Sequence, residues 1–246
     1  MGLFNNLKTD GLEETEDRLG GGSRVIDTDI YTGKIAMAYF GTSTKGSQFI
    51  ALTFKFGDQE YKETCYITNQ KGENFFLNKQ DNTKKVPLPG FVVIDDLCQI
   101  ITGKPLCEQD HEEKAVAIYD FDLKKDVATN VPVLVDLLNQ EVSLGIVKSL
   151  VNKKGPAPDY ALLAETREEN NIEKVFHTET KMTVPEARKG DSVGTFWDAW
   201  LDKNKGQVRN KVKEVTAPGK PGQPGSAGAA NTPAAAGRPS LFNAKK

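Results

Sequence analysis

Aromatic and basic side chains are interleaved along residues 61–80 in a pattern that could bind a nucleic acid. The rings are Tyr61, Tyr66, Phe75 and Phe76, and the lysines among them are Lys62, Lys71 and Lys79. Each base of an unpaired nucleic acid offers a flat face to a ring, and each phosphate offers a negative charge to a lysine. The chemistry indicated by this stretch is therefore stacking and charge neutralisation.

Strand periodicity predicts which of these side chains share a surface. Side chains alternate across a strand, so one face carries Tyr61, Glu63, Cys65 and Ile67. Cys65 and Ile67 mark that face as the inner one, which leaves Lys62 and Tyr66 together outside. In the preceding strand, the apolar face is formed by Ile50, Leu52, Phe54 and Phe56. Phe49 and Lys55 lie opposite it, so a ring and a lysine again point outward.

We therefore expect a DNA-binding surface built from rings and lysines: Lys34, Phe49, Lys55, Lys62, Tyr66, Lys71, Phe75, Phe76, Lys79, Lys84 and Lys85. Phe75 and Phe76 are neighbours in one strand pattern and point to opposite sides, so one of them is exposed or covered by a loop. An alternative interpretation stays open. The rings could cover a second layer of protein while the lysines keep edge strands soluble, and the face would then bind protein rather than DNA.

Residues typical of catalysis are few and scattered. His111 and His177 lie in no recognisable triad or metal motif, and no glycine-rich nucleotide loop is present. Asp120 and Asp122 would share one strand face, as a Mg²⁺-dependent nuclease requires. No third carboxylate or lysine has a sequence spacing that would indicate a nuclease site. We expect a protein that is not an enzyme and needs no cofactor, with a nuclease as a distant alternative.

The cysteines argue against a disulfide framework, because Cys65, Cys98 and Cys107 are odd in number and irregularly spaced. Cys98, Cys107 and His111 have the spacing C-x8-C-x3-H, and Cys65 could complete four zinc ligands. No CxxC pair holds two thiolates close by local geometry. Buried, inert thiols are therefore favoured, and whether these residues bind a metal is left open.

The elements that would position the rings begin near residue 33. Strand patterns at 33–40, 47–56, 60–68 and 74–79 are separated by turn sequences and predict an antiparallel meander. A helix follows, with Asp95 as its N-cap and Gly103 at its end. Strand patterns return at 114–123 and at 131–151, the latter bent at Asn139–Gln140.

This order predicts a mainly β fold, an oligonucleotide-binding-type Greek-key β-barrel with inserted and C-terminal helices. A plain β-sandwich is the alternative. Residues 156–190 look irregular and charged. Beyond them, a helical stripe made of Phe196, Trp197, Trp200 and Leu201 is expected to dock both tryptophans onto the barrel.

Composition divides the chain into an N-terminal arm (1–22), a binding domain (23–215) and a disordered, flexible tail rich in Ala, Gly and Pro (216–246). The net charge is −2, but residues 217–246 carry four bases and no acid, which leaves 28 bases against 34 acids in residues 1–216. An acidic domain binds a polyanion only through a local basic stripe. No stretch approaches the roughly 20 apolar residues of a membrane span, and the N-terminus does not read as a signal peptide, so a cytosolic protein is expected.

Several long blocks resemble a family of bacteriophage single-stranded-DNA-binding proteins from tailed phages. They are "EETEDRLGGG", "YKETCYITNQKGENFF", "VPLPGFVVIDDLCQIITGKPL", "VPVLVDLLNQEVSLGI" and "ETREENNIEKVFHTET". The resemblance covers about residues 10–215. It implies an oligonucleotide-binding fold and sequence-independent binding of single-stranded DNA during phage replication, recombination and repair, in the cytoplasm of the bacterial host. It also implies contacts with replication proteins such as a polymerase or helicase, and no catalysis. The oligomeric state is not fixed, and a homodimer is left open.

The tail departs from that class, whose members typically end in acidic residues and an aromatic one. Here "LFNAKK" keeps Phe242 but has no acid. We expect the linker to tether Leu241 and Phe242 as a hook for a partner protein, while Lys245 and Lys246 attract DNA weakly. The alternative is a tail without a role.

Overall fold

The structure, a computed structural model, describes residues 25–120, 122–156 and 160–215. Strands make up 47% of these residues and helices 19%, and the larger sheet is mainly antiparallel, so the predicted mainly β fold is confirmed. Residues 25–213 belong to one compact unit. The predicted arm and tail, with Leu241 and Phe242, lie outside the described residues.

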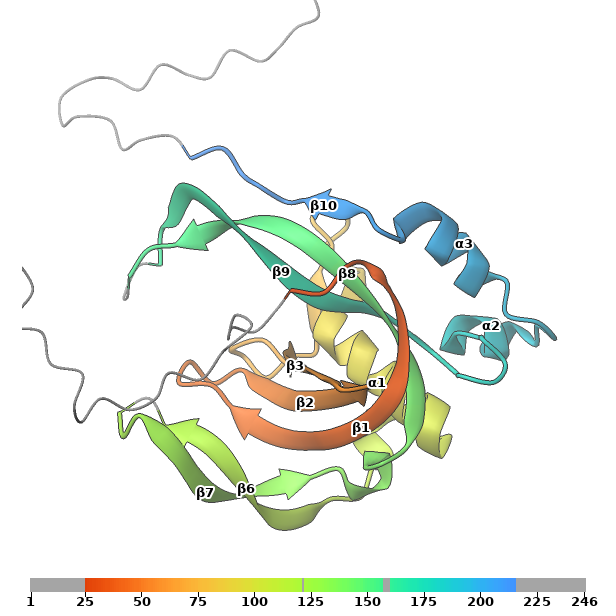
Figure 1. Ribbon diagram of the computed structural model, residues 1–246, viewed down its shortest axis with the longest axis horizontal. Coiled ribbons are helices and arrows are strands. Elements are labelled where there is room, and N and C mark those ends of the chain that lie inside the picture. The colour runs from red at the N-terminus through yellow and green to blue at the C-terminus, as the bar shows by residue number, and fades with distance from the viewer. Residues whose placement is uncertain (1–24, 121, 157–159, 216–246) are drawn as a thin grey trace, which may run out of the picture. The chain divides into compact units, whose positions relative to one another are not determined.

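Three strands form the antiparallel meander that the apolar alternation predicts. They are β1 (Asp29–Thr42), β2 (Gln48–Phe56) and β3 (Gln59–Tyr66). β2 lies between the other two and pairs with both. β1 is long and strongly curved (Figure 1), so its first half leaves β2 and pairs with another strand.

That other strand belongs to a long hairpin. β8 (Glu141–Lys154) pairs with the first half of β1 and with β9 (Leu162–Phe176), and β10 (Val208–Asn210) adds a short parallel pairing. The prediction of an irregular segment at 156–190 is wrong, because β9 occupies much of it. Residues 162–168 are exposed, and a strand without a buried face shows no apolar alternation in its sequence.

A second hairpin joins the sheet at the second half of β1. β6 (Glu112–Asp120) pairs with β7 (Lys125–Val133), and β7 meets β1 through the pairing of Val133 with Tyr39. The short 3-10 turn η2 (Val135–Leu137) and Asn139, whose φ is 61°, then lead into β8. The bend predicted at Asn139 is confirmed.

The fourth predicted strand is not part of the meander. β4 (Phe75–Leu77) pairs with β5 (Lys85–Pro87) in a separate two-stranded sheet. The Asn69 side chain accepts hydrogen bonds from the backbone N–H groups of Lys71 and Glu73, and this tight turn carries the chain away from β3.

The inserted helix begins earlier than predicted. α1 (Pro89–Thr102) has a proline in its first turn, and it ends at Gly103, which has the expected left-handed conformation with φ 74°. Asp95 is not its N-cap. It lies inside the helix and accepts a hydrogen bond of 2.8 Å from the backbone N–H of Leu106, in the 3-10 turn η1 (Leu106–Glu108).

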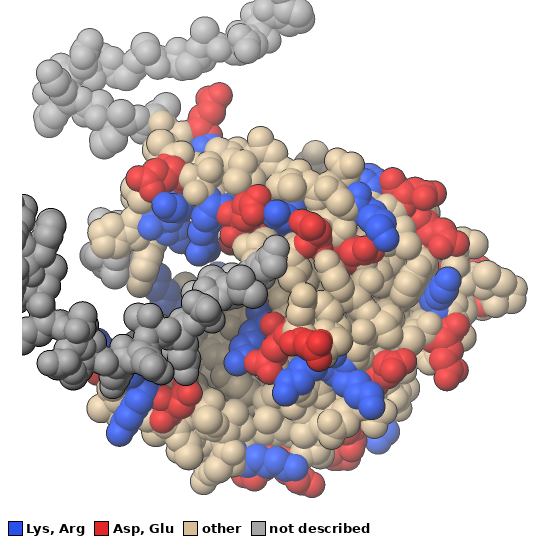
Figure 2. All heavy atoms as spheres, in the orientation of Figure 1, with Lys and Arg blue, Asp and Glu red and all other residues tan. Residues whose placement is uncertain are grey.

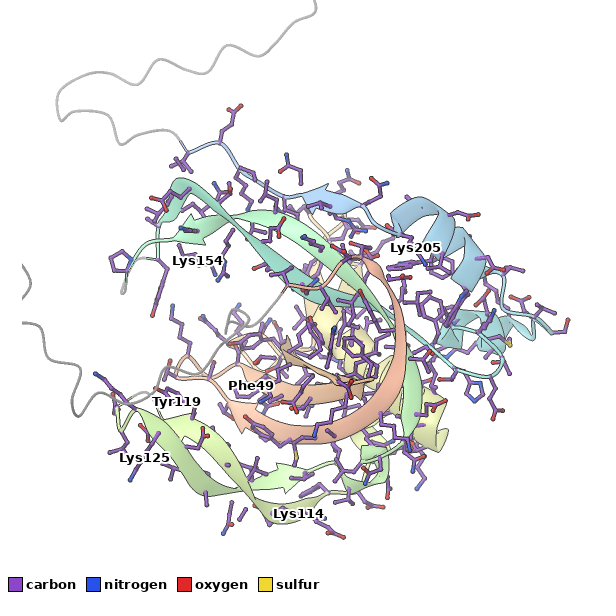
Figure 3. The ribbon with its side chains drawn as sticks, in the orientation of Figure 1. Phe49, Lys114, Tyr119, Lys125, Lys154 and Lys205 are labelled. Atoms are coloured by element: carbon purple, nitrogen blue, oxygen red, sulfur yellow. The ribbon has the colours of Figure 1, made fainter. Side chains whose placement is uncertain are left out.

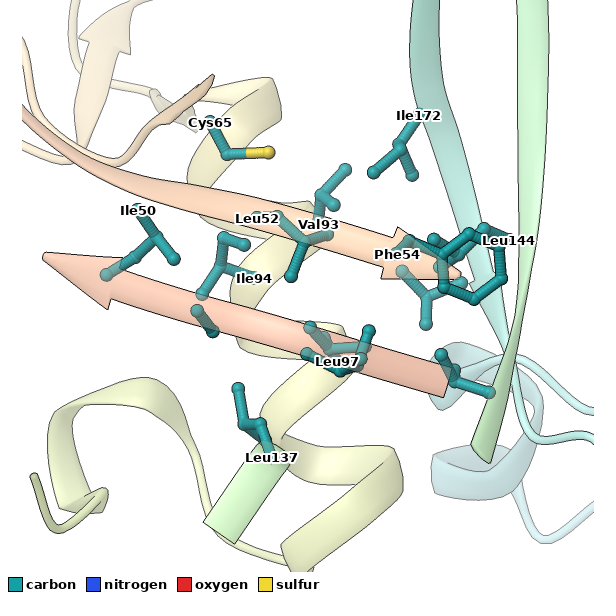
Figure 4. Packing of buried hydrophobic residues seen from close by; sticks show 14 of the residues in the cluster. Ile50, Leu52, Phe54, Cys65, Val93, Ile94, Leu97, Leu137, Leu144 and Ile172 are labelled. Carbon is teal, nitrogen blue, oxygen red and sulfur yellow. The ribbon is translucent and has the colours of Figure 1, made fainter. Parts of the chain in front are cut away.

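The main core lies between α1 and the inner face of the meander. Figure 4 shows side chains of β2 facing the helix, with residues of β8 and β9 closing one side: Ile50, Leu52, Phe54, Val93, Ile94, Leu97, Leu144 and Ile172. β3 pairs with β2 and β9 pairs with β8, but β3 and β9 do not pair, so the described strands form no closed barrel.

Two short helices follow β9, α2 (Val184–Lys189) and α3 (Phe196–Asn204). Trp200 of α3 is buried against Val147 and Phe176, and Trp197 packs at the edge of this second cluster. The predicted docking of both tryptophans is confirmed. None of the helices in the described part of the chain has the length and apolar character to cross a bilayer.

Candidate nucleic-acid interface

The face of the meander that points away from the core gathers rings and lysines from three strands. Its cross-strand rows, from one end to the other, are Gly41–Phe49–Tyr66, Tyr39–Ala51–Thr64, Met37–Thr53–Lys62 and Lys34–Lys55–Glu60. We name this surface the outer face. The alternation read from β2 and β3 therefore places Phe49, Lys55, Lys62 and Tyr66 on one side, as predicted.

A bulge in β1 completes the outer face. The register shifts between Ile35 and Met37, so one extra residue reverses the alternation along the strand. Ile35 and Ala38 point into the core, while Lys34 and Tyr39 both point outward. Tyr39 could not be predicted to face outward from the sequence, because simple alternation from Ile35 places its side chain inside.

The aromatic end of the outer face is formed by Phe49 and Tyr66. Their ring centroids lie 5.8 Å apart in an edge-to-face arrangement, and Tyr66 is 50% exposed. A Cβ atom added at Gly41 would lie 2.4 Å from Cζ of Phe49. The missing side chain of Gly41 therefore makes the room that the Phe49 ring occupies.

The charged end holds three lysines around one carboxylate. Glu60 pairs with Lys62 at 2.9 Å and with Lys55 at 3.6 Å, and the hydrogen bond from Lys62 holds the pKa of the Glu60 carboxyl below its usual value. Lys34 completes the row beside Lys55. The three ammonium groups outnumber the carboxylate, so this end can attract phosphates.

Two hairpins lie on either side of the meander, β6–β7 below it and β8–β9 above it in the view of Figure 1. Figure 3 shows Phe49 of β2 and Tyr119 of β6 on the lower side and Lys154 of β8 on the upper side, and lysines and acids alternate over the described surface in Figure 2. Tyr119 of β6 is half exposed. Tyr119 and Lys154 were not predicted from the sequence, although the aromatic residue in "AIYDF" could have pointed to Tyr119.

The remaining predicted residues lie apart from the outer face, in the separate sheet and its loops. Phe75 carries the Lys85 ammonium 4.3 Å from its ring centroid, and Lys84 pairs with Asp81 at 3.2 Å. Phe76 is 47% exposed. Lys71 and Lys79 are exposed in the loops before and after β4. The predicted fourth strand of the meander is therefore wrong, because β4 pairs with β5 in a separate sheet and not with β3, and these side chains do not extend the outer face.

The described residues do not assemble the metal site or the acidic pair considered as alternatives. No group of three or more His, Cys, Asp or Glu side chains in the described residues could hold a metal ion. Cys65 and Cys98 are buried as predicted, but the prediction of a buried thiol is wrong for Cys107, which is exposed. The predicted pairing of Asp120 and Asp122 on a strand face is wrong. Asp120 ends β6 and accepts hydrogen bonds from the backbone N–H groups of Asp122 and Leu123 in the turn.

Comparisons of the chain with protein-family models, with curated proteins and with solved structures found no match. The candidate site therefore depends on its geometry, namely two adjacent rings at one end of a sheet face and three lysines at the other.

Proposed function

We propose that this protein binds single-stranded DNA without sequence preference, on the outer face. The observation that supports the proposal is the placement of Phe49 and Tyr66 on the same pleated surface as Lys34, Lys55 and Lys62. Rings stack on bases of any identity, and ammonium groups neutralise the phosphates between them. From Phe49 to Lys55 the surface extends about 20 Å along β2.

The fold proposed here is of the oligonucleotide-binding type. Its support is the element order, a three-stranded meander, an inserted helix and a returning pair of strands, with β1 curved so that it pairs with both β2 and β8. In such folds the surface around the second and third strands binds oligonucleotides. Together with the resemblance to phage single-stranded-DNA-binding proteins, this favours a non-catalytic protein. We propose that it protects DNA in the bacterial host cytoplasm during phage replication and recombination, alongside replication proteins.

The decisive test changes the Tyr66 ring. Tyr66→Ala is expected to weaken binding to an oligo(dT) strand by about 1–3 kcal/mol, because one stacking platform is lost. Tyr66→Phe is the matched control and keeps full affinity, since it keeps the ring. Fluorescence anisotropy of a labelled oligonucleotide gives the affinities, and thermal unfolding shows whether each variant keeps its fold.

Two outcomes contradict the proposal. One is a Tyr66→Ala variant that has the same melting temperature as the parent protein and binds the oligonucleotide equally tightly. The other is binding that does not weaken as salt rises, since release of counterions from phosphates gives a log–log slope of about −0.7 per phosphate for single strands. If Tyr66→Ala unfolds, Phe49→Leu provides the same test at the adjacent ring.

A further inference from the structure

The edge of β6 that faces away from β7 is a row of main-chain groups with no described strand beside it. Among the described strands, β6 pairs with β7 alone, and β7 lies between β6 and β1 (Figure 1). No residue of β6 is buried. An edge of this kind offers N–H and C=O groups with which another strand can pair.

The sequence of β6 does not protect this edge. Residues 115–119, "AVAIY", contain no charge and no proline, and these are the usual devices against pairing of two sheet edges. The outer edges of β3 and β9 are different, because the Glu63 side chain of β3 already accepts a hydrogen bond from the backbone N–H of Ile172 in β9. β6 therefore has the edge best suited to an added strand.

One face of the β6–β7 hairpin is apolar and only partly covered. The cross-strand pairs place four half-buried side chains on this face, Val116, Ile118, Val127 and Val131. Two strands alone cannot cover such a face. A strand added beside β6 brings further apolar side chains against Val116 and Ile118.

We propose that the strand added at this edge is β6 of a second copy of the chain, antiparallel to the first about a two-fold axis at Ala117. In this register Val116 lies opposite Ile118, and Lys114 lies opposite Asp120. An apolar residue thus meets an apolar one, and a cation meets an anion. Each contact occurs twice, because a two-fold axis repeats it.

The side chains on the other face of β6 fit the same register. Tyr119 lies opposite Ala115, so a large side chain meets a small one at each end. The two Ala117 residues meet at the axis, where their methyl groups leave room for each other.

Moving the axis by one position along β6 loses this match. With the axis at Val116, Glu112 lies opposite Asp120, and with the axis at Ile118, Val116 lies opposite Asp120. Like charges directly opposite each other are destabilising, and a carboxylate opposite a valine gains no partner. The good fit of β6 to itself in one register favours a second copy over a strand of another protein.

The present partners of the two charged residues are compatible with the new contact. Lys114 pairs with Glu112 at 3.3 Å, and both side chains are exposed, so an ammonium with three N–H donors can also meet a second carboxylate. Oδ1 of Asp120 accepts the two backbone hydrogen bonds of the hairpin turn. Oδ2 of Asp120 is therefore the atom that meets the ammonium.

Disulfide formation at the axis tests the register. Directly opposed residues of antiparallel strands have Cα atoms about 4.5–5.5 Å apart, which a disulfide can bridge. In a Cys107→Ser background, which removes the exposed cysteine, Ala117→Cys is expected to give a covalent dimer on mild oxidation by air and copper. Ala115→Cys is the matched control. Its two thiols are offset by about 13 Å along the strands, so it should cross-link about ten-fold more slowly.

Substitution of Lys114 tests the charges, through the dissociation constant of the dimer measured by analytical ultracentrifugation of the full chain. Lys114→Glu places like charges opposite each other at two symmetric positions and is expected to weaken the dimer about ten-fold at low salt. Lys203→Glu is the control, because it makes the same change of charge at an exposed lysine of α3.

Three results would overturn the inference. They are a chain that sediments as a monomer at every concentration, cross-linking of Ala115→Cys at least as fast as that of Ala117→Cys, or equal weakening by Lys114→Glu and Lys203→Glu. Thermal unfolding under reducing conditions shows whether each variant keeps its fold, and the cysteine and charge variants test the same register independently. None of these readouts uses DNA, so a failure of the proposed DNA binding is distinguishable from a failure of the β6 pairing.

Discussion

At the scale of single residues, Glu60 competes with any phosphate that approaches the outer face. Its carboxylate pairs with both Lys62 and Lys55, and the hydrogen bond to Glu60 raises the pKa of the Lys62 ammonium. All three side chains are exposed, so the pairs themselves contribute little to stability. Their effect is instead to hold two cations away from a ligand.

Glu60→Gln is therefore expected to strengthen binding to oligo(dT), by about two- to five-fold at low salt, because an exposed pair is worth about 0.2–1 kcal/mol. It also makes the salt dependence steeper, since freed lysines neutralise more phosphate. Anisotropy titrations at several salt concentrations measure both effects.

The control for Glu60→Gln is Glu112→Gln on β6. Glu112 pairs with the exposed Lys114 at 3.3 Å, so the substitution makes the same change of charge away from the outer face. If both variants gain affinity equally, the gain reflects net charge alone, and the role assigned to Glu60 is wrong.

At the scale of the elements, regular strands were predictable and irregular ones were not. Along β2 and β3 more buried and more exposed side chains alternate, so their sequences reveal both faces. The bulge in β1 and the exposed half of β9 escape prediction. A bulge reverses the alternation without a distinct residue signal, and an exposed strand has no apolar period. The position of β4 depends on strand pairing, which is set by tertiary contacts rather than by local sequence.

The pairing of β1 with β2 gives an element-level prediction at Gly41. Gly41→Ala places a methyl group 2.4 Å from Cζ of Phe49, so the ring must move away from its position beside Tyr66. Loss of oligonucleotide affinity comparable to that of Phe49→Leu is expected, about 1–3 kcal/mol, although Gly41 itself offers no side chain to DNA. Titration of Gly41→Ala, Phe49→Leu and the double variant measures the coupling.

The two substitutions should not be additive, because both act through one ring. Additive losses would mean that Gly41 acts by another route. Full affinity in Gly41→Ala would mean that the position of the Phe49 ring does not matter for binding.

At the scale of the whole molecule, the two halves of the sheet meet across the unpaired edges of β3 and β9. The Glu63 side chain crosses this gap. Oε2 of Glu63 accepts a hydrogen bond of 2.7 Å from the backbone N–H of Ile172 and one of 2.6 Å from the Tyr61 hydroxyl. A side-chain carboxylate thus takes the place of strand pairing between the meander and the β8–β9 hairpin.

This arrangement makes stability depend on pH. Burial raises the pKa of the Glu63 carboxyl above its usual value, although the hydrogen bonds from Tyr61 and Ile172 oppose the shift. Since the folded protein holds this proton more tightly than the unfolded chain, the stabilising contribution is complete below the ordinary glutamate range. It is lost as the pH rises through the raised pKa. Protonated Glu63 therefore favours the folded state, and ionised Glu63 opposes it.

Glu63→Gln should remove this dependence, because a neutral amide oxygen can accept both hydrogen bonds without a buried charge. The melting temperature of Glu63→Gln minus that of the parent is expected to increase as the pH rises from about 4 to about 8. Tyr61→Phe should act in the opposite direction. It removes a hydrogen bond that favours the ionised carboxylate, so the Tyr61→Phe variant should lose more stability than the parent as the pH rises. A difference that stays constant across this range for Glu63→Gln would show that Glu63 crosses the gap without titrating. A Tyr61→Phe variant that is less sensitive to pH would show that the hydroxyl does not support the carboxylate.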